Sequence, residues 1–432
     1  MERRHGAHVI LGAITPAYDS VDAETLSYPY LRSALETHSL PAFLVRHASE
    51  VWHGRFRFSP AVMQEDWRST YLINAAYRLQ KSWTMPEKIF WSTQFTTTSV
   101  KLFGRPLRKE VASIATQELE MLEEVVRDYE LDEEFTSPVL NAYRSLLQPR
   151  AASLPALEER YGDLLGELRE VFMEEYGDCF EVFEPYAPNI PLSPTEIAGV
   201  FLAALNILRV RHPIWSDWKV RMNRSARLSV NVLDKTIIVG RRRAPLLISE
   251  VKGLFAHEVL VHANRAVQGA RHGAELAMGL PDYLAAEEGL GVLMEAAVNG
   301  VVPPKVKDRY VDIALALGDW RRRPMTRIEM YTFCYTRSVL RAIAADEPLD
   351  LTLLEKVTWE HVNRIYRGSL GNKYIAVFTK DVAYYRGFIK MANYLRRAAR
   401  KDRLAESLAY SCQGKFDPTN PRHRKFLKTV KY

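Results

Sequence analysis

The chain has 432 residues, of which 47% are apolar and 26% charged, as in a folded globular protein large enough for two lobes. No apolar run approaches the roughly 18 residues that a membrane-spanning helix needs, so we expect no membrane span. The three cysteines lack metal-type spacing, which argues against a disulfide framework and indicates a reducing compartment. Lys and Arg outnumber Asp and Glu by 59 to 52, a modest net charge of +7.

Residues 1–30 have a mixed composition, and we expect this segment to be partly disordered. Within it, Val9–Ile14 faintly resembles the apolar core of a signal peptide, but the run is short and ends at Thr15-Pro16. We therefore expect a cytoplasmic protein, with secretion as the alternative.

Residues 31–190 are predicted to form an N-terminal helical lobe. Leu107–Tyr129 and Pro155–Tyr176 place Leu and Val at helical spacing among acidic residues, a pattern typical of helices that pack on a core. Four prolines punctuate Phe183–Thr195 and predict a linker to a second lobe, residues 191–432.

The second lobe begins with a predicted helix from Ser193 to about Val210. Trp218–Met222 and Arg227–Gly240 then have strand character, and Asp234-Lys235 supplies the turn of a hairpin. Further helices are predicted over Met325–Ala345, Leu349–Arg367 and Lys380–Arg400. The fold class is therefore α+β, predominantly helical, with a small antiparallel sheet or hairpin in the second lobe.

The most informative segment is His257-Glu258-Val259-Leu260-Val261-His262. In a zinc hydrolase two imidazoles hold the metal, and a neighbouring carboxylate activates the water that the metal binds. A regular α-helix turns about 500° over five residues and leaves the two rings roughly 140° apart. A wide π-type turn reduces this to roughly 50°, so we predict such a turn between His257 and His262.

The alternative is that both histidines are ordinary helix residues that flank a glutamate by chance. The apolar lead-in, Ile248–Ala256, favours the metal site, because unpaired imidazoles would be costly inside an apolar helix.

A third ligand is expected from Glu287-Glu288-Gly289, which lies within an apolar helical stretch. One of two adjacent carboxylates must turn inward there, and a buried carboxylate needs a cation. We predict that Glu288 is the ligand and that Glu287 contacts a ligand histidine. Gly289 has no side chain, so we expect it at the contact with the histidine turn. The alternative is a solvated acidic pair at a helix start.

This combination resembles the tyrosine/phenylalanine carboxypeptidase family. That family includes the microtubule-associated tyrosine carboxypeptidases, which remove the C-terminal tyrosine of α-tubulin. The likeness extends over most of the chain, in the segments Lys101–Pro106, Gly279–Tyr283, Arg367-Gly368 and Phe378–Gly387. A more distant likeness is to dipeptidyl-peptidase III, which shares the five-residue histidine spacing.

The resemblance implies one Zn²⁺ per chain, held by His257, His262 and Glu288, with Glu258 as the catalytic base. The residue before the ligand, Glu287, differs from the Gln that bacterial relatives often have, which leaves the surroundings of the ligands open.

A carboxypeptidase must also bind the terminal carboxylate of its substrate, which a cation near the metal does best. The candidates are Arg367, Lys380 and Arg337. Tyr384 is the candidate donor to the oxyanion, with His361 as an alternative.

We therefore expect a zinc carboxypeptidase that removes a C-terminal Tyr or Phe from peptide or protein tails. The alternatives are an exopeptidase acting from the N-terminus and a silent binding protein stabilised by zinc. An edge strand of the hairpin could bind the substrate backbone, or the hairpin could only cover the helix. Basic clusters could attract acidic tails; they are Arg241–Arg243, Arg321–Arg323 and Arg396–Lys401. No nucleic-acid-binding motif accompanies them, and the oligomeric state is left open.

Overall fold

The structure, a computed structural model, describes residues 97–99, 106–147, 154–280, 282–318, 324–325, 327–346, 350–366, 375–377 and 379–430. Several sequence predictions fall wholly or partly outside these residues. They concern the N-terminal segment 1–30, residues 31–96 of the predicted helical lobe, most of Lys101–Pro106, Pro281, the Arg321–Arg323 cluster, the candidate anchor Arg367 with Gly368, and Phe378.

The described residues are mostly helical and include one small three-stranded mixed sheet, which confirms the predicted fold class. The chain divides into two compact units. Unit 1 comprises Met1–Ala156, of which only part is described, and Lys307–Val382; unit 2 comprises Leu157–Val306 and Ala383–Tyr432. The predicted linker, Phe183–Thr195, lies within unit 2, where Leu192 pairs with Leu246 through two backbone hydrogen bonds.

Unit 2 carries the histidine motif. Its helices are α8 (Leu157–Glu181), α9 (Pro194–Arg211), α10 (Ile248–Phe255), α11 (Asn264–Ala270), α12 (Ala274–Met278), α13 (Leu284–Asn299), α17 (Val382–Ala399), α18 (Leu404–Cys412) and α19 (Pro421–Thr429), with the 3-10 turn η1 (Pro213–Trp215). The helix predicted from Ser193 is α9. Ser193 caps it by accepting from the Glu196 N–H, while the Glu196 carboxylate accepts from the Ser193 N–H.

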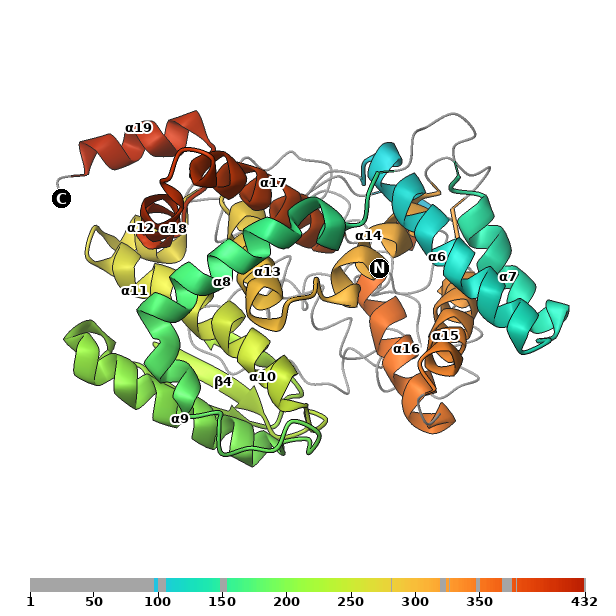
Figure 1. Cartoon of the computed structure of the whole chain (residues 1–432), viewed down its shortest axis with the longest axis horizontal. Coiled ribbons are helices and arrows are strands. Elements are labelled where there is room, and N and C mark those ends of the chain that lie inside the picture. The colour runs from blue at the N-terminus through green and yellow to red at the C-terminus, as the bar shows by residue number, and fades with distance from the viewer. Residues whose placement is uncertain are drawn as a thin grey trace, which may run out of the picture. The chain divides into compact units, whose positions relative to one another are not determined.

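The sheet of unit 2 contains β2 (Lys219–Asn223), β3 (Leu228–Asn231) and β4 (Thr236–Gly240) in the order β2-β4-β3. The predicted hairpin is confirmed, since β3 and β4 are antiparallel and Asn231 pairs with Thr236. The sequence did not predict that β2 pairs with β4 in parallel. Helix α9 packs against β2 and β4, and β4 lies beside α10 in Figure 1.

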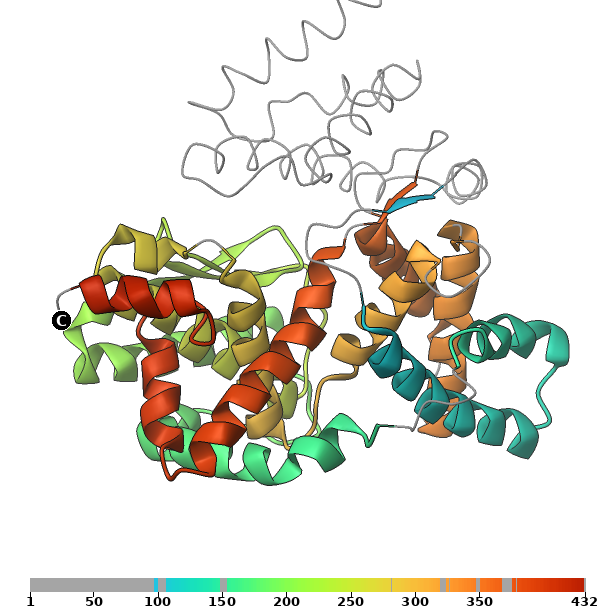
Figure 2. The ribbon, with the colours of Figure 1, turned by 90° about the horizontal axis from the view of Figure 1, so that it is seen from above.

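The C-terminal helices also belong to unit 2. Tyr161 on α8 donates from its hydroxyl to Asn393 Oδ1 on α17 at 3.2 Å, and the two helices cross in Figure 2. An edge-to-face contact between Tyr161 and Phe388 continues the same interface. Helix α17 is thereby fixed beside the core of the unit that holds the histidines.

Unit 1 contains α6 (Arg108–Asp128), α7 (Glu133–Arg144), most of α14 (Pro304–Leu317), α15 (Arg327–Ala344), α16 (Leu351–Ile365) and the 3-10 turn η3 (Thr379–Asp381). A short parallel pair joins β1 (Thr97–Ser99) to β5 (Ile375–Val377). Among the described residues, no helix is both long enough and apolar enough to cross a bilayer.

Candidate metal centre

The histidine motif lies on three consecutive helical segments, α10, the π-helix η2 (Ala256–Ala263) and α11. At the end of η2, the Asn264 N–H donates to Val259 O, five residues earlier. The wide turn predicted from the histidine spacing is therefore confirmed, although it extends over eight residues instead of a single bulge. The rings of His257 and His262 consequently meet, with their centroids 4.8 Å apart.

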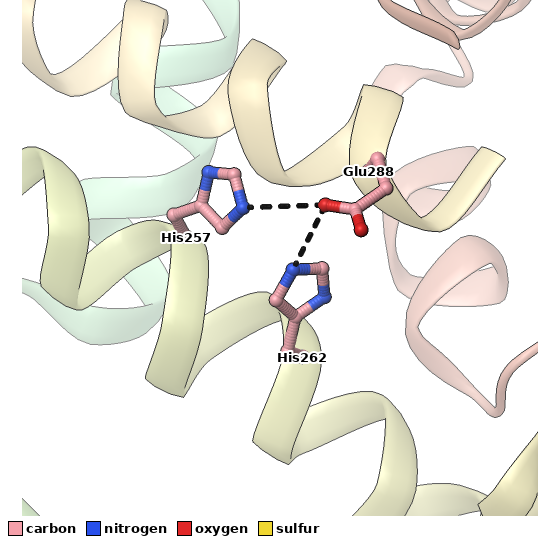
Figure 3. Close-up of side chains that lie close together, drawn as sticks. All are labelled: His257, His262 and Glu288. Carbon is pink, nitrogen blue, oxygen red and sulfur yellow. Dashed lines mark ion pairs between the residues drawn. The ribbon is translucent and has the colours of Figure 1, made fainter. Parts of the chain in front are cut away.

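Helix α13 brings the third side chain of the site. Glu288 Oε2 lies 3.9 Å from His257 Nε2 and 3.6 Å from His262 Nε2, as Figure 3 shows. All three side chains are mostly withdrawn from solvent, with relative exposures of 7% for His257, 13% for His262 and 8% for Glu288.

The second ring nitrogen of each histidine has its own glutamate. His262 Nδ1 is 2.9 Å from Glu287 Oε1, and His257 Nδ1 is 3.0 Å from Glu295 Oε2. The contact expected between Glu287 and a histidine is therefore present. Each Nδ1 acts as the donor to its carboxylate, so that in a neutral ring the lone pair of Nε2 faces Glu288.

Each of these glutamates also pairs with a cation; the cations of Glu287 are buried, and the lysine of Glu295 is partly exposed. Glu287 pairs with Arg265 and, at 2.8 Å, with Lys415. Glu295 pairs with Lys305 at 2.8 Å. Burial alone would raise the pKa of each carboxyl group, but the cations and the histidine hydrogen bonds outweigh it. They hold the pKa of Glu287 far below its usual range and lower that of Glu295 to about 2.

The centre of the triad requires a positive charge. Two imidazole lone pairs and a carboxylate oxygen converge there, and all of them are acceptors. Burial opposes protonation of His262, yet the hydrogen bond to Glu287 and the negative charges of Glu287 and Glu288 outweigh burial and raise its pKa to about 10. A metal ion satisfies the same requirement. Ligands at 2.0–2.2 Å in a tetrahedron lie about 3.4 Å apart, close to the two separations between Nε2 and Oε2.

Glu258, the candidate base, follows His257 on η2 and is half-buried. Within the described part of the chain it makes no hydrogen bond or ion pair. Burial raises its pKa, the two histidines oppose the rise, and the charges of Glu288 and Glu295 add to it. Such a carboxyl group has its oxygens available to a water molecule next to the triad.

Glycines let the helices of the site approach one another. A Cβ on Gly289 would lie 2.1 Å from the Gly387 carbonyl carbon, so α13 and α17 touch through their backbones. The expectation that Gly289 meets the histidine turn is therefore wrong. That position belongs to Gly291, where a Cβ would lie 2.9 Å from His257 Nε2.

The predicted substrate residues are distributed over both units. Tyr384 is half-buried on α17 in unit 2, one turn before Gly387. Lys380 is half-buried in η3 of unit 1. Arg337 is buried on α15 of unit 1, where two of its nitrogens lie 2.7 and 2.9 Å from the carboxylate of Asp312.

A second group of potential ligands surrounds that same carboxylate. His361 Nε2 is 2.6 Å from Asp312 Oδ2, and Cys334 Sγ donates to this oxygen at 3.8 Å. Arg337 already neutralises Asp312, so this cluster has no comparable need for a metal ion. His361 therefore has a carboxylate partner within unit 1, and its alternative role as an oxyanion donor stays a prediction.

Sequence reasoning missed Glu295 and the three cations Arg265, Lys305 and Lys415. One signal was available, because Glu288 and Glu295 are seven residues apart and share a face of an apolar helix. The cations gave no comparable signal, since Lys415 comes from a distant part of the chain.

Comparisons with known proteins match only a C-terminal part of the chain. The family profile described as microtubule-associated tyrosine carboxypeptidase matches residues 349–420, a segment that runs from α16 to the loop after α18. The match includes Tyr384, Lys380 and Lys415 but begins after the histidine motif and Glu288, which lie outside it. No curated protein and no solved structure matches the chain significantly.

Proposed function

We propose that this chain is a zinc-dependent carboxypeptidase that releases a C-terminal tyrosine or phenylalanine from peptide or protein tails. One zinc ion would be held by His257, His262 and Glu288. The convergence of two imidazole nitrogens and one carboxylate oxygen, with Glu258 adjacent in η2, carries the proposal. The match to the tyrosine carboxypeptidase profile supports the aromatic specificity.

The three ligands fit a catalytic zinc ion better than a structural one. Catalytic zinc keeps three protein ligands and an open position, whereas structural zinc has four protein ligands. A structural site also has no use for a carboxylate such as Glu258 beside the ligands. When bound, zinc polarises the scissile carbonyl and lowers the pKa of water.

The protein residues perform the remaining steps. Glu258 accepts a proton from the attacking water and returns it to the nitrogen of the leaving amino acid. Glu287 and Glu295 hold the histidine rings in place through Nδ1, and their cations keep both carboxylates ionised. Tyr384 is our candidate donor to the oxyanion, because its helix touches α13 directly after Glu288.

The substrate chain would lie along β3. This strand is at an edge of the sheet and packs against η2, so its backbone can pair with an extended peptide. For the terminal carboxylate, Lys380 and Arg367 remain candidates. Arg337 is a weaker one, because Asp312 already occupies its guanidinium group.

Acidic tails would be attracted by arginines around the β2–β3 turn. The Arg241 N–H donates to Asn223 O and the Arg242 N–H to Ser225 O, which ties the end of β4 to this turn. Four exposed arginines gather there: Arg224, Arg227, Arg241 and Arg242. We also propose a reducing, cytoplasmic location, on the ground that the three cysteines are free thiols.

Peptides that differ only in their last residue test the activity. The zinc-loaded protein should shorten peptides ending in Tyr or Phe by one residue, as read by mass spectrometry, and should leave those ending in Asp or Lys nearly intact. Release of dipeptides from the N-terminus would replace the proposal with the exopeptidase alternative. No cleavage of any member would favour the silent binding protein.

A further inference from the structure

Several arginines in the described residues have a buried Nε that makes no hydrogen bond, and Arg243 differs from the rest in having no other side-chain partner. The others pair through further nitrogens or an ion pair: Arg209, Arg265, Arg309 and Arg337. For Arg243 the described part of the chain offers no side-chain hydrogen bond or ion pair at all. The side chain is half-buried, and a guanidinium nitrogen that is removed from water and left unpaired is costly, so the position calls for an acceptor.

The backbone around Arg243 is held firmly in place. Its N–H donates to Gly240 O at 3.1 Å, and the two preceding residues donate to the β2–β3 turn. Arg243 therefore follows β4 directly, and both β3 and β4 pack against η2, the helix of the histidines. A donor on such a rigid support needs little reorganisation to bind a ligand.

Charged groups of the metal centre act on Arg243 through space. Burial lowers the pKa of its guanidinium group, while the nearby charges of Glu250, Glu258 and Glu295 oppose that change. Glu258 is the proposed base and Glu295 holds His257, so Arg243 is within electrostatic reach of the metal centre. These carboxylates favour the cation but do not form an ion pair with it.

We infer that Arg243 binds the terminal α-carboxylate of the substrate. The inference rests on the proposed function and gives the anchoring role to a residue of unit 2, the unit that holds the triad. A guanidinium group pairs with a carboxylate through two parallel hydrogen bonds, which a C-terminal amide cannot reproduce. Arg243 thereby selects chain ends and rejects internal peptide bonds.

Direct binding tests the inference without turnover. In the full-length, zinc-loaded E258Q protein, a neutral peptide ending in tyrosine should bind about ten- to a hundredfold more tightly as the free acid than as the amide. Adding Arg243→Gln should abolish this preference, whereas Arg243→Lys should keep part of it. Arg169→Gln, at an exposed arginine of α8, should leave the preference intact. Isothermal titration calorimetry measures all four proteins, with zinc content and melting temperature as folding controls.

The results separate this inference from the proposed activity. A preference for the free acid that survives Arg243→Gln overturns the inference, as does equal binding of the two peptides, including no measurable binding of either. A lower turnover number in Arg243→Gln for both peptides, with the preference retained, would instead make Arg243 an oxyanion donor. If the wild-type protein binds the free acid through Arg243 but releases no aromatic residue, the proposed function fails and the inference stands.

Discussion

The His257 ring occupies the space in which a side chain of residue 291 would lie. A Cβ on Gly291 would approach His257 Nε2 to 2.9 Å and Cε1 to 3.0 Å. The His257 ring makes a buried contact with Glu295, so the ring has little freedom to move away. The absence of a side chain at Gly291 is therefore a condition for the triad.

Replacing Gly291 with Ala should displace the ring from its ligand position. We expect zinc affinity to fall about ten- to a hundredfold, the range seen when a ligand histidine loses its orientation. Competition with a zinc-binding dye measures the affinity. Gly166→Ala on α8 is the control, because nothing lies within 4 Å of a Cβ there. Unchanged zinc affinity in Gly291→Ala would show that His257 is not a ligand.

The contact between Glu295 and His257 should contribute to zinc affinity as well as to the stability of the fold. Glu295→Gln keeps the shape but removes the charge that orients the Nδ1 proton, and we expect about ten- to a hundredfold weaker zinc binding. Glu275→Gln, an exposed glutamate of α12, serves as the control. Equal zinc affinity in the Glu295 and Glu275 variants would contradict the role given to Glu295.

Glu258→Gln should slow catalysis while leaving the metal site intact. With zinc content and melting temperature unchanged, turnover should fall by a factor on the order of 10² to 10⁴, the usual contribution of a general base. The measurement is the rate of tyrosine release at saturating peptide. Turnover close to that of the wild type would mean that another group activates the water.

The buried pair of Arg337 and Asp312 makes the stability of the protein depend on acid pH. Burial would raise the pKa of Asp312, but the charge of Arg337 and the hydrogen bond with His361 outweigh it and hold this pKa well below its usual range. A lowered pKa in the folded state contributes stability above the unfolded value of about 3.9, and that stability is lost as pH falls below it. Chemical unfolding at pH 7, 4 and 3 measures the loss.

Asp312→Asn should reduce this loss between pH 4 and 3. At pH 7 the same variant should lower the free energy of unfolding by about 3–5 kcal/mol, because Arg337 stays buried without its partner. Asp217→Asn is the control, since Asp217 pairs with Lys235 at the surface and its removal should change stability little. An equally steep loss in Asp312→Asn would assign the acid sensitivity to other carboxylates.

The dependence of kcat/KM on ionic strength should show whether the exposed arginines attract acidic tails. Raising the ionic strength should lower kcat/KM for a peptide with several glutamates more than for a neutral peptide, because exposed charges are screened. Replacing Arg224 and Arg227 with Gln should lower kcat/KM for the acidic peptide alone. The same salt response for both peptides would exclude steering by these arginines.

The sequence was most informative where chemistry constrained the backbone. Two histidines five residues apart can share one ion only on a widened helix, so η2 could be predicted from the spacing. The hairpin of β3 and β4 is local, and its turn residues identify it. The parallel pairing of β2 with β4 could not be predicted. These strands are neighbours in the sheet, but β3 lies between them in the sequence, and no local sequence pattern indicates that they pair.

The surroundings of the triad were less predictable for a similar reason. Lys415 and Glu287 are far apart in the sequence, and nothing in either segment indicates that they meet. Arg337 shows a related difficulty, because its sequence context does not indicate its partner. Its charge suggested a role in substrate binding, whereas the structure gives it a buried carboxylate partner on α14.

Metal analysis of two histidine variants tests the central claim most directly. The described residues contain two groups of potential ligands, one with His262 and one with His361. The wild-type protein should contain close to one zinc ion per chain, His262→Ala should lose most of it, and His361→Ala should retain it. Full zinc retention in His262→Ala, or loss of zinc in His361→Ala alone, would contradict the assignment of the metal to His257, His262 and Glu288.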